Sequence, residues 1–244
     1  FVLAALYTVY GVGMRMTALE MTAMRGMRDM PGPGVPGVWS AGYAALVFLM
    51  WWVMMVAMML PSVAPTVLLY TALLRRGANS ALVPAISTAF LAGYLVVWAG
   101  FSLLAMGLQW ALEAQGIVSA TMMTLIQTVP GALVLIAAGI FQFTTLKQAC
   151  LRHCRSPAEF LTTRRRDGAT GAFVMGLEHG AYCLGCCWFL MALLFVGGIM
   201  NLYWIVGLAV FVAVEKLAPR GDLIAKGAGA VLILWGGYIL WSAI

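Results

Sequence analysis

Long apolar segments, separated by short polar ones, constrain the fold of this chain more than any other feature. Hydrophobic residues make up 64% of its 244 residues and charged residues only 9%, whereas a soluble domain carries roughly 25% charged residues. A membrane-crossing helix needs about 20 predominantly apolar residues. The composition therefore predicts an all-α polytopic integral membrane protein that forms a single transmembrane domain over residues 1–244.

Seven segments are apolar enough to be predicted as crossing helices. They cover about residues 1–20, 39–70, 81–112, 120–146, 171–196, 200–217 and 222–243. The chain begins at Phe1 without a Met, so we interpret the first segment as a truncated helix rather than a signal peptide. Two connections are long: one rich in Met, Pro and Gly at about 21–38, and a basic one at about 147–170.

Basic residues predict which side of the membrane each connection faces. Most of the 14 Lys and Arg residues follow the second, fourth and sixth predicted spans: Arg75, Arg76, Lys147, Arg152, Arg155, Arg164, Arg165, Arg166, Lys216, Arg220 and Lys226. Arg15, Arg25 and Arg28 lie on the other side. Since cytoplasmic loops are enriched in Lys and Arg, the amino end and the 147–170 connection are predicted to be cytoplasmic and the 21–38 connection external.

The net charge of +6 follows from this topology and does not indicate nucleic-acid binding. Membrane lipids are the expected partners of the basic residues. The run Arg164-Arg165-Arg166 predicts a contact with anionic lipid headgroups, or serves only as a topology signal.

A stripe of sulfur and imidazole side chains lies within the fifth predicted span. Because a helix repeats every 3.6 residues, His179, Cys183, Cys186 and Cys187 share one face. Polar side chains in a membrane are costly unless something binds them, and a soft metal ion is the simplest candidate. One helix cannot surround an ion, so further ligands would come from neighbouring helices. The alternative is that these cysteines pack as small apolar residues.

A second stripe consists of methionines in the second predicted span. Met54 and Met58 are four residues apart, as are Met55 and Met59. Thioether sulfur is a soft, neutral ligand that suits Cu(I). The alternative is that these methionines fill the core, as methionine commonly does.

A third group follows the fourth predicted span. Cys150 and Cys154 are four residues apart and His153 lies beside them, which predicts a site for metal uptake or release, or else a solvated helix end. Glu178, next to His179, is either a proton carrier or metal counter-charge, or the partner of an arginine near the membrane surface.

Three of these runs resemble a bacterial family of unknown function whose members are regarded as metal-binding integral membrane proteins. They are Met50-Trp51-Trp52-x-Met54-Met55-x-Ala57-Met58-Met59-Leu60-Pro61, the run from Phe141-Gln142 through Leu146-Lys147, Cys150 and Cys154 to Pro157, and Gly180-x-x-Cys183-x-Gly185-Cys186-Cys187-Trp188. Met200-Asn201-Leu202 and Glu215-Lys216 fit the same family pattern. The resemblance covers about residues 40–220 and departs from the family pattern at Phe143-Thr144-Thr145. It implies a multi-pass protein of the bacterial inner (plasma) membrane.

The favoured hypothesis is a membrane protein that holds or delivers copper through a Cys/His/Met site between helices. Copper is favoured over zinc because thioether and thiolate together suit Cu(I) best. A first alternative is an accessory subunit of a larger membrane enzyme complex, with partner subunits and no metal of its own. A second is a haem-binding electron-transfer subunit that uses His153 and His179 as axial ligands. The sequence shows no catalytic triad, phosphate loop or carboxylate pair, so an enzyme is not predicted.

Overall fold

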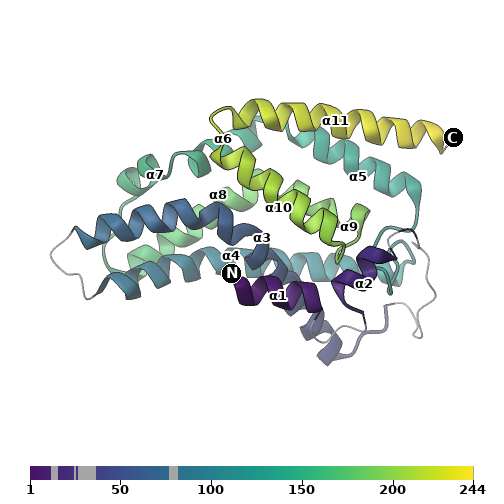
Figure 1. The fold of residues 1–244 in the computed structure, drawn as a ribbon, viewed down its shortest axis with the longest axis horizontal. Coiled ribbons are helices and arrows are strands. Elements are labelled where there is room, and N and C mark those ends of the chain that lie inside the picture. Colours follow the sequence, from purple (N-terminus) through teal and green to yellow (C-terminus); the bar gives the residue numbers. More distant parts are fainter. Residues whose placement is uncertain (12–15, 25, 27–36, 77–81, 244) are drawn as a thin grey trace.

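The structure, a computed structural model, describes residues 1–11, 16–24, 26, 37–76 and 82–243 as a bundle of helices (Figure 1). Its helices are α1 (Val2–Tyr10), α2 (Ala18–Ala23), α3 (Ala41–Arg75), α4 (Val83–Ala114), α5 (Thr128–Phe141), α6 (Thr145–Arg155), α7 (Pro157–Thr163), α8 (Gly168–Ala192), α9 (Leu194–Gly197), α10 (Leu202–Leu217) and α11 (Gly221–Ser242). No strand is assigned within these ranges. The all-helical prediction is confirmed.

Helices α4 and α8 form the most extensively packed pair because glycines let their backbones approach. A Cβ atom at Gly93 of α4 would collide with the carbonyl oxygen of Phe173, and one at Gly176 of α8 would collide with that of Phe90. Small residues at such crossings are typical of membrane helices, which associate mainly through close packing. This contact fixes the position of α8 along α4, and with it the position of the α8 cysteines.

The fourth predicted span is not one straight helix. It divides into α5 and α6, which meet at an angle of 64°. The bend falls at Phe143-Thr144-Thr145, where the hydroxyl of Thr144 accepts a hydrogen bond of 3.3 Å from the backbone amide of Lys147 and so caps α6. The prediction that residues 147–170 form a loop is wrong in part, because α6 and α7 occupy most of this segment.

The described residues contain four helical segments that are long and apolar enough to cross a membrane: α3, α4, the continuous stretch of α8 and α9, and α11. The bent pair α5–α6 makes a fifth if it counts as one span. The prediction of seven spans is not confirmed, since α1 has 9 residues and α10 has 16, fewer than the roughly 20 that a crossing needs. The amino-end orientation stays a prediction.

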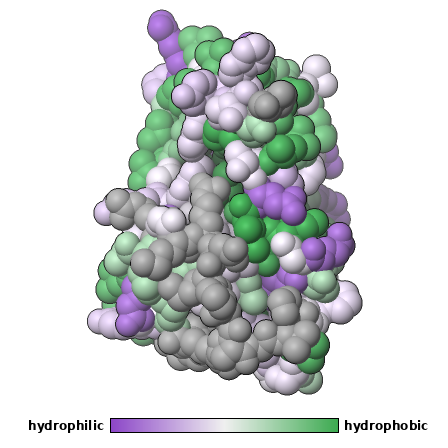
Figure 2. Space-filling view, turned by 90° about the vertical axis from the view of Figure 1, so that its right-hand side faces the viewer, coloured by the Kyte–Doolittle hydropathy of each residue, from purple (hydrophilic) through white to green (hydrophobic). Residues whose placement is uncertain are grey.

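The surface of the bundle is unusually apolar, while several charged side chains lie inside. Exposed large hydrophobic side chains follow the outer faces of the long helices, among them Leu68, Leu104, Leu133, Val210, Val231 and Leu234. Glu113, Lys147, Glu215 and Lys216 are buried. Figure 2 views the molecule from the end near the carboxyl terminus, where hydrophilic residues lie among the hydrophobic ones. The apolar outer faces of the long helices suit lipid better than water.

Candidate metal centre

Three cysteines of α8 lie at the centre of the bundle, and two more reach them from α6. Cys183, Cys186 and Cys187 are buried, whereas Cys150 and Cys154 are partly exposed, and all five are free thiols. The thiol of Cys154 interacts with those of Cys183 and Cys186. The second helix that the sequence requires for a metal site is therefore α6.

A glycine brings α6 against α8 at this point. The Sγ atom of Cys150 lies only 2.6 Å from where a Cβ of Gly185 would be, so a larger residue there would displace this thiol. Cys150 is also close enough to Cys186 for their charges to interact. The solvent exposure of the cysteines thus decreases from the partly exposed pair on α6 to the buried three on α8.

The thiols are clustered but are not arranged as a closed ligand cage. Cys186 and Cys187 both donate hydrogen bonds to the carbonyl oxygen of Cys183, at 3.0 and 2.9 Å. Within the described ranges, no three His, Cys, Asp or Glu side chains stand in positions from which they would hold one ion. Side-chain rotation would be needed for binding, and the donor set, thiols in an apolar core, is chemically suited to a soft ion.

A lysine is directed at the central thiol. The Nζ atom of Lys216 on α10 donates to the Sγ atom of Cys183 at 2.9 Å and to the hydroxyl of Ser62 on α3 at 3.3 Å. The hydroxyl of Tyr94 on α4 forms a 3.0 Å hydrogen bond with the same sulfur. Cys183 therefore sits where α3, α4, α8 and α10 converge, and a positive charge lies against its sulfur.

A second buried lysine ties α6 to the cluster. The Nζ atom of Lys147 lies 2.6 Å from Oε1 of Glu215, and both side chains are fully buried. The same ammonium donates to the carbonyl oxygen of Cys186 at 3.0 Å. A buried charge requires a partner. Because Glu215 balances Lys147, it does not also neutralise Lys216, and the sulfur of Cys183 is the group that faces the Lys216 charge.

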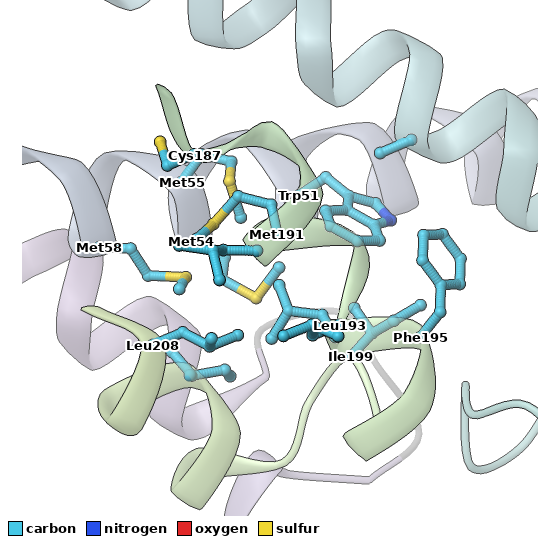
Figure 3. Close-up of a cluster of buried hydrophobic side chains, with 14 of the residues drawn as sticks. Trp51, Met54, Met55, Met58, Cys187, Met191, Leu193, Phe195, Ile199 and Leu208 are labelled. Carbon is cyan, nitrogen blue, oxygen red and sulfur yellow. The ribbon is translucent and has the colours of Figure 1, made fainter. Parts of the chain in front are cut away.

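The methionine stripe of α3 joins the cysteines in one hydrophobic cluster, which includes Met54, Met55, Met58 and Met59 together with the three cysteines of α8. Figure 3 shows Met54, Met55 and Met58 beside Cys187 and Met191. Thioethers and thiols therefore share a core, which both the ligand interpretation and the core-filler interpretation allow.

The two histidines have different surroundings. His179 is buried among the rings of Phe90, Tyr94 and Phe160, and its Nδ1 atom has no hydrogen-bond partner among the described residues. It lies one helical turn from Cys183, as the sequence predicts.

The ring of His153 is exposed and stacks on Tyr182 with centroids 4.1 Å apart, while its Nδ1 atom contacts the carbonyl oxygen of Ala149 at 2.9 Å. Its role as a metal ligand stays a prediction. Glu178 pairs with Arg166 at 2.6 Å, as the second of its two interpretations predicts.

Sequence reasoning missed the charged residues of the site. It assigned Lys147 and Lys216 to cytoplasmic loops as topology signals, whereas both are buried beside cysteines. One signal was available: Lys147 lies three residues before Cys150 and so shares its helix face. The adjacent Glu215 and Lys216 end an apolar helix, a position that is compatible with either a loop or a core.

Comparison with known proteins adds one finding. Residues 48–239 match the family PpoB2, which is described as a copper chaperone. This match covers every candidate ligand in the chain and fits the metal-related family that the sequence resembles. No curated protein and no solved structure matches the chain.

The ion pair between Lys147 and Glu215 generates a prediction about stability. The substitution Lys147→Met leaves the Glu215 carboxylate buried without its partner, so the free energy of unfolding should fall by about 3–5 kcal/mol. Adding Glu215→Leu should restore most of the loss. Chemical unfolding of the purified protein in detergent measures both.

The matched control is Arg165→Gln, which breaks an exposed pair with Asp167 (3.8 Å) and should change stability by less than about 1 kcal/mol. Equal effects of Lys147→Met and Arg165→Gln would show that the buried pair does not hold the helices together.

Proposed function

This chain belongs to the PpoB2 family of copper chaperones, and we propose that it is a membrane protein that binds Cu(I) at the cysteine cluster and passes it to a recipient protein. The observation that carries the proposal is the gathering of five free thiols from α6 and α8, with a buried lysine hydrogen-bonded to the sulfur of Cys183. A chaperone must hold its cargo and release it, so the cluster must offer both buried and accessible ligands. The cysteines on the two helices meet that requirement.

Cys183, Cys186 and Cys187 are the proposed primary ligands, with Cys154 completing the set from α6. Thiolates are soft ligands that select Cu(I), Zn²⁺ and iron–sulfur clusters. The nearby thioethers favour Cu(I) within this group, because neutral methionine sulfur does not suit Zn²⁺. His179, one turn before Cys183, would support the same site with its unpartnered Nδ1 atom.

Lys216 gives the site its electrostatic balance. Two or more thiolates bound to one Cu(I) ion carry a net negative charge, which is costly in an apolar core unless a positive charge offsets it. Lys216 lies 2.9 Å from Cys183 and is not neutralised by the buried Glu215, which pairs with Lys147. It would therefore stabilise the thiolate–copper form over the empty, protonated form.

The two partly exposed cysteines are the proposed point of exchange. Cys154 touches the buried thiols and also reaches the surface, so it can share an ion with either side. A Cu(I) ion can pass from one thiol ligand to the next without being released into solution. Cys150 and His153 lie on the same short helix and would supply further donors there.

Met54, Met55, Met58 and Met59 are the proposed softer second site on the other side of the cluster. All four belong to the hydrophobic cluster that contains Cys187, and Figure 3 shows Met54, Met55 and Met58 on the α3 side of it. The external connection would present its methionines first. Its Met27 and Met30 fall outside the described residues, whereas Met21 is buried on α2 beside the same core.

The proposed setting is the bacterial inner membrane, with the amino end and α6 on the cytoplasmic side. The apolar outer faces of the long helices and the basic residues of α6, of the α7–α8 connection and of the α10–α11 connection support this orientation. Copper would then move from the external methionines toward the cysteines of α6.

Copper content of the purified protein tests the primary ligands. The double variant Cys183→Ser/Cys186→Ser should lose Cu(I) affinity by at least about tenfold, because two anionic soft donors become hydroxyls. A chromogenic Cu(I) chelator in competition with the protein measures the affinity. Equal copper content and affinity in the wild-type and variant proteins would refute the proposal.

Volume-conserving substitutions separate the two interpretations of the methionines. Met54→Leu/Met58→Leu keeps the core filled and should cost less than about 1.5 kcal/mol of stability. If the thioethers bind copper, the variant should lose the weaker of two binding steps while it retains the cysteine site. Unchanged copper titration curves together with unchanged unfolding would assign these methionines to packing alone.

The charge of Lys216 generates a further prediction. Lys216→Met should weaken Cu(I) binding by about tenfold, the usual effect of losing a group that supports metal ligands, while unfolding of the copper-free protein changes little or improves. Lys226→Met on α11 removes an equal charge away from the cysteines and should leave the affinity unchanged. Equal affinities of the two variants would show that Lys216 does not balance the site.

A further inference from the structure

A cavity of about 270 Å³ lies against α6, the helix that carries Cys150 and Cys154. It is enclosed by the bend between α5 and α6, by α6 itself and by the start of α11. Its volume is much larger than the roughly 30 Å³ that a water molecule occupies in the liquid, but smaller than the pockets of about 300–1,000 Å³ that hold drug-sized ligands. It suits a small group rather than a nucleotide or a peptide.

One wall of the cavity is a fully buried amide. Gln142 follows α5 and lines the cavity, and neither its Oε1 nor its Nε2 atom has a hydrogen-bond partner within the described structure. Buried side-chain amides are normally paired, and each unpaired group costs about 1–3 kcal/mol. The amide therefore offers two N–H donors to whatever occupies the cavity.

The other walls carry an excess of positive charge. Arg152, Arg155 and Lys147 line the cavity together with a single carboxylate, Asp222. Arg155 donates to the carbonyl oxygens of Ala218 and Pro219 and lies 3.5 Å from Asp222.

The other two cations that line the cavity differ in their partners. Lys147 is balanced by Glu215. Arg152 makes no ion pair within the described ranges, which leaves its guanidinium charge available to the cavity. Arginine presents planar pairs of N–H donors that match the oxygens of phosphate.

We propose that this cavity is a binding site for a phosphate-type oxyanion, held by Arg152 and by the amide of Gln142. The oxyanion is either free inorganic phosphate or the phosphate of an anionic lipid headgroup, which share this chemistry. The inference is independent of copper, since none of these side chains is a proposed metal ligand.

Matched arginine variants test the site. Arg152→Gln removes a cavity-lining guanidinium, and Arg75→Gln makes the same charge change on an exposed arginine at the end of α3, outside the cavity. Inorganic phosphate, added to the detergent-solubilised full chain against chloride at constant ionic strength, should raise the Tm of the wild-type protein in a saturable way. Arg152→Gln should weaken phosphate binding by about tenfold, as expected for the loss of one charge-assisted hydrogen bond, and Arg75→Gln should not.

A second arm identifies the source of the phosphate. Native mass spectrometry counts phosphatidylglycerol retained by each variant, with phosphatidylcholine as the neutral comparison. Specific retention of phosphatidylglycerol that Arg152→Gln abolishes, without a response to inorganic phosphate, assigns the site to a lipid headgroup; the reverse pattern assigns it to the free ion.

Gln142→Leu tests the amide without changing charge. The copper-free protein should be at least as stable as the wild type, because an unpaired buried amide is removed, while the response to the oxyanion is lost. If Arg152→Gln and Arg75→Gln behave alike in both arms, or if Gln142→Leu keeps the full response, the proposal is overturned.

Discussion

The ammonium group of Lys147 holds together the part of the molecule on which the site depends. It pairs with Glu215 of α10 at 2.6 Å and donates to the carbonyl of Cys186 on α8 at 3.0 Å, so one side chain of α6 fixes three helices. The bend at Thr144 is what turns α6 inward to make these contacts. Without the bend, Cys150 and Cys154 would continue along the axis of α5, away from the thiols of α8.

Burying two lysines and a glutamate in an apolar bundle opposes folding unless each charge is compensated. Well-packed hydrophobic residues of similar volume would be neutral or more stable in many proteins, so stability alone does not account for this arrangement. The proposed copper site supplies a reason for the placement of Lys216 against Cys183, since a fixed positive charge would stabilise thiolates that collect around a monovalent ion. On that proposal the charges serve the chemistry of the cluster, while the Gly93 and Gly176 contacts supply the packing.

The sequence predicts part of this arrangement well. Helical class and the common face of His179, Cys183 and Cys187 follow from apolar run length and from the 3.6-residue period, both of which are local properties. The bend between α5 and α6 was not predicted, because no proline or glycine occurs at Phe143-Thr144-Thr145 and a threonine alone does not distinguish a helix cap from the interior of a continuous span. Lys216 was misplaced for a related reason: in sequence, a lysine at the end of an apolar helix has the same pattern whether it faces water or a sulfur atom on another helix.

The gradient of exposure across the sulfurs suggests how one site can both retain and release an ion. Cys183, Cys186 and Cys187 are buried and Lys216 donates to the sulfur of Cys183, so in the proposed site these three cysteines would hold Cu(I) most tightly. Cys154 contacts two of them yet is partly exposed, so an ion shared with it needs no passage through free solution. Because the same α6 helix carries Cys154 and part of the wall of the phosphate-sized cavity, any ligand that shifts α6 would alter both. Lys147, which lines that cavity and also binds the Cys186 carbonyl, is the physical link between the cavity and the cysteine cluster.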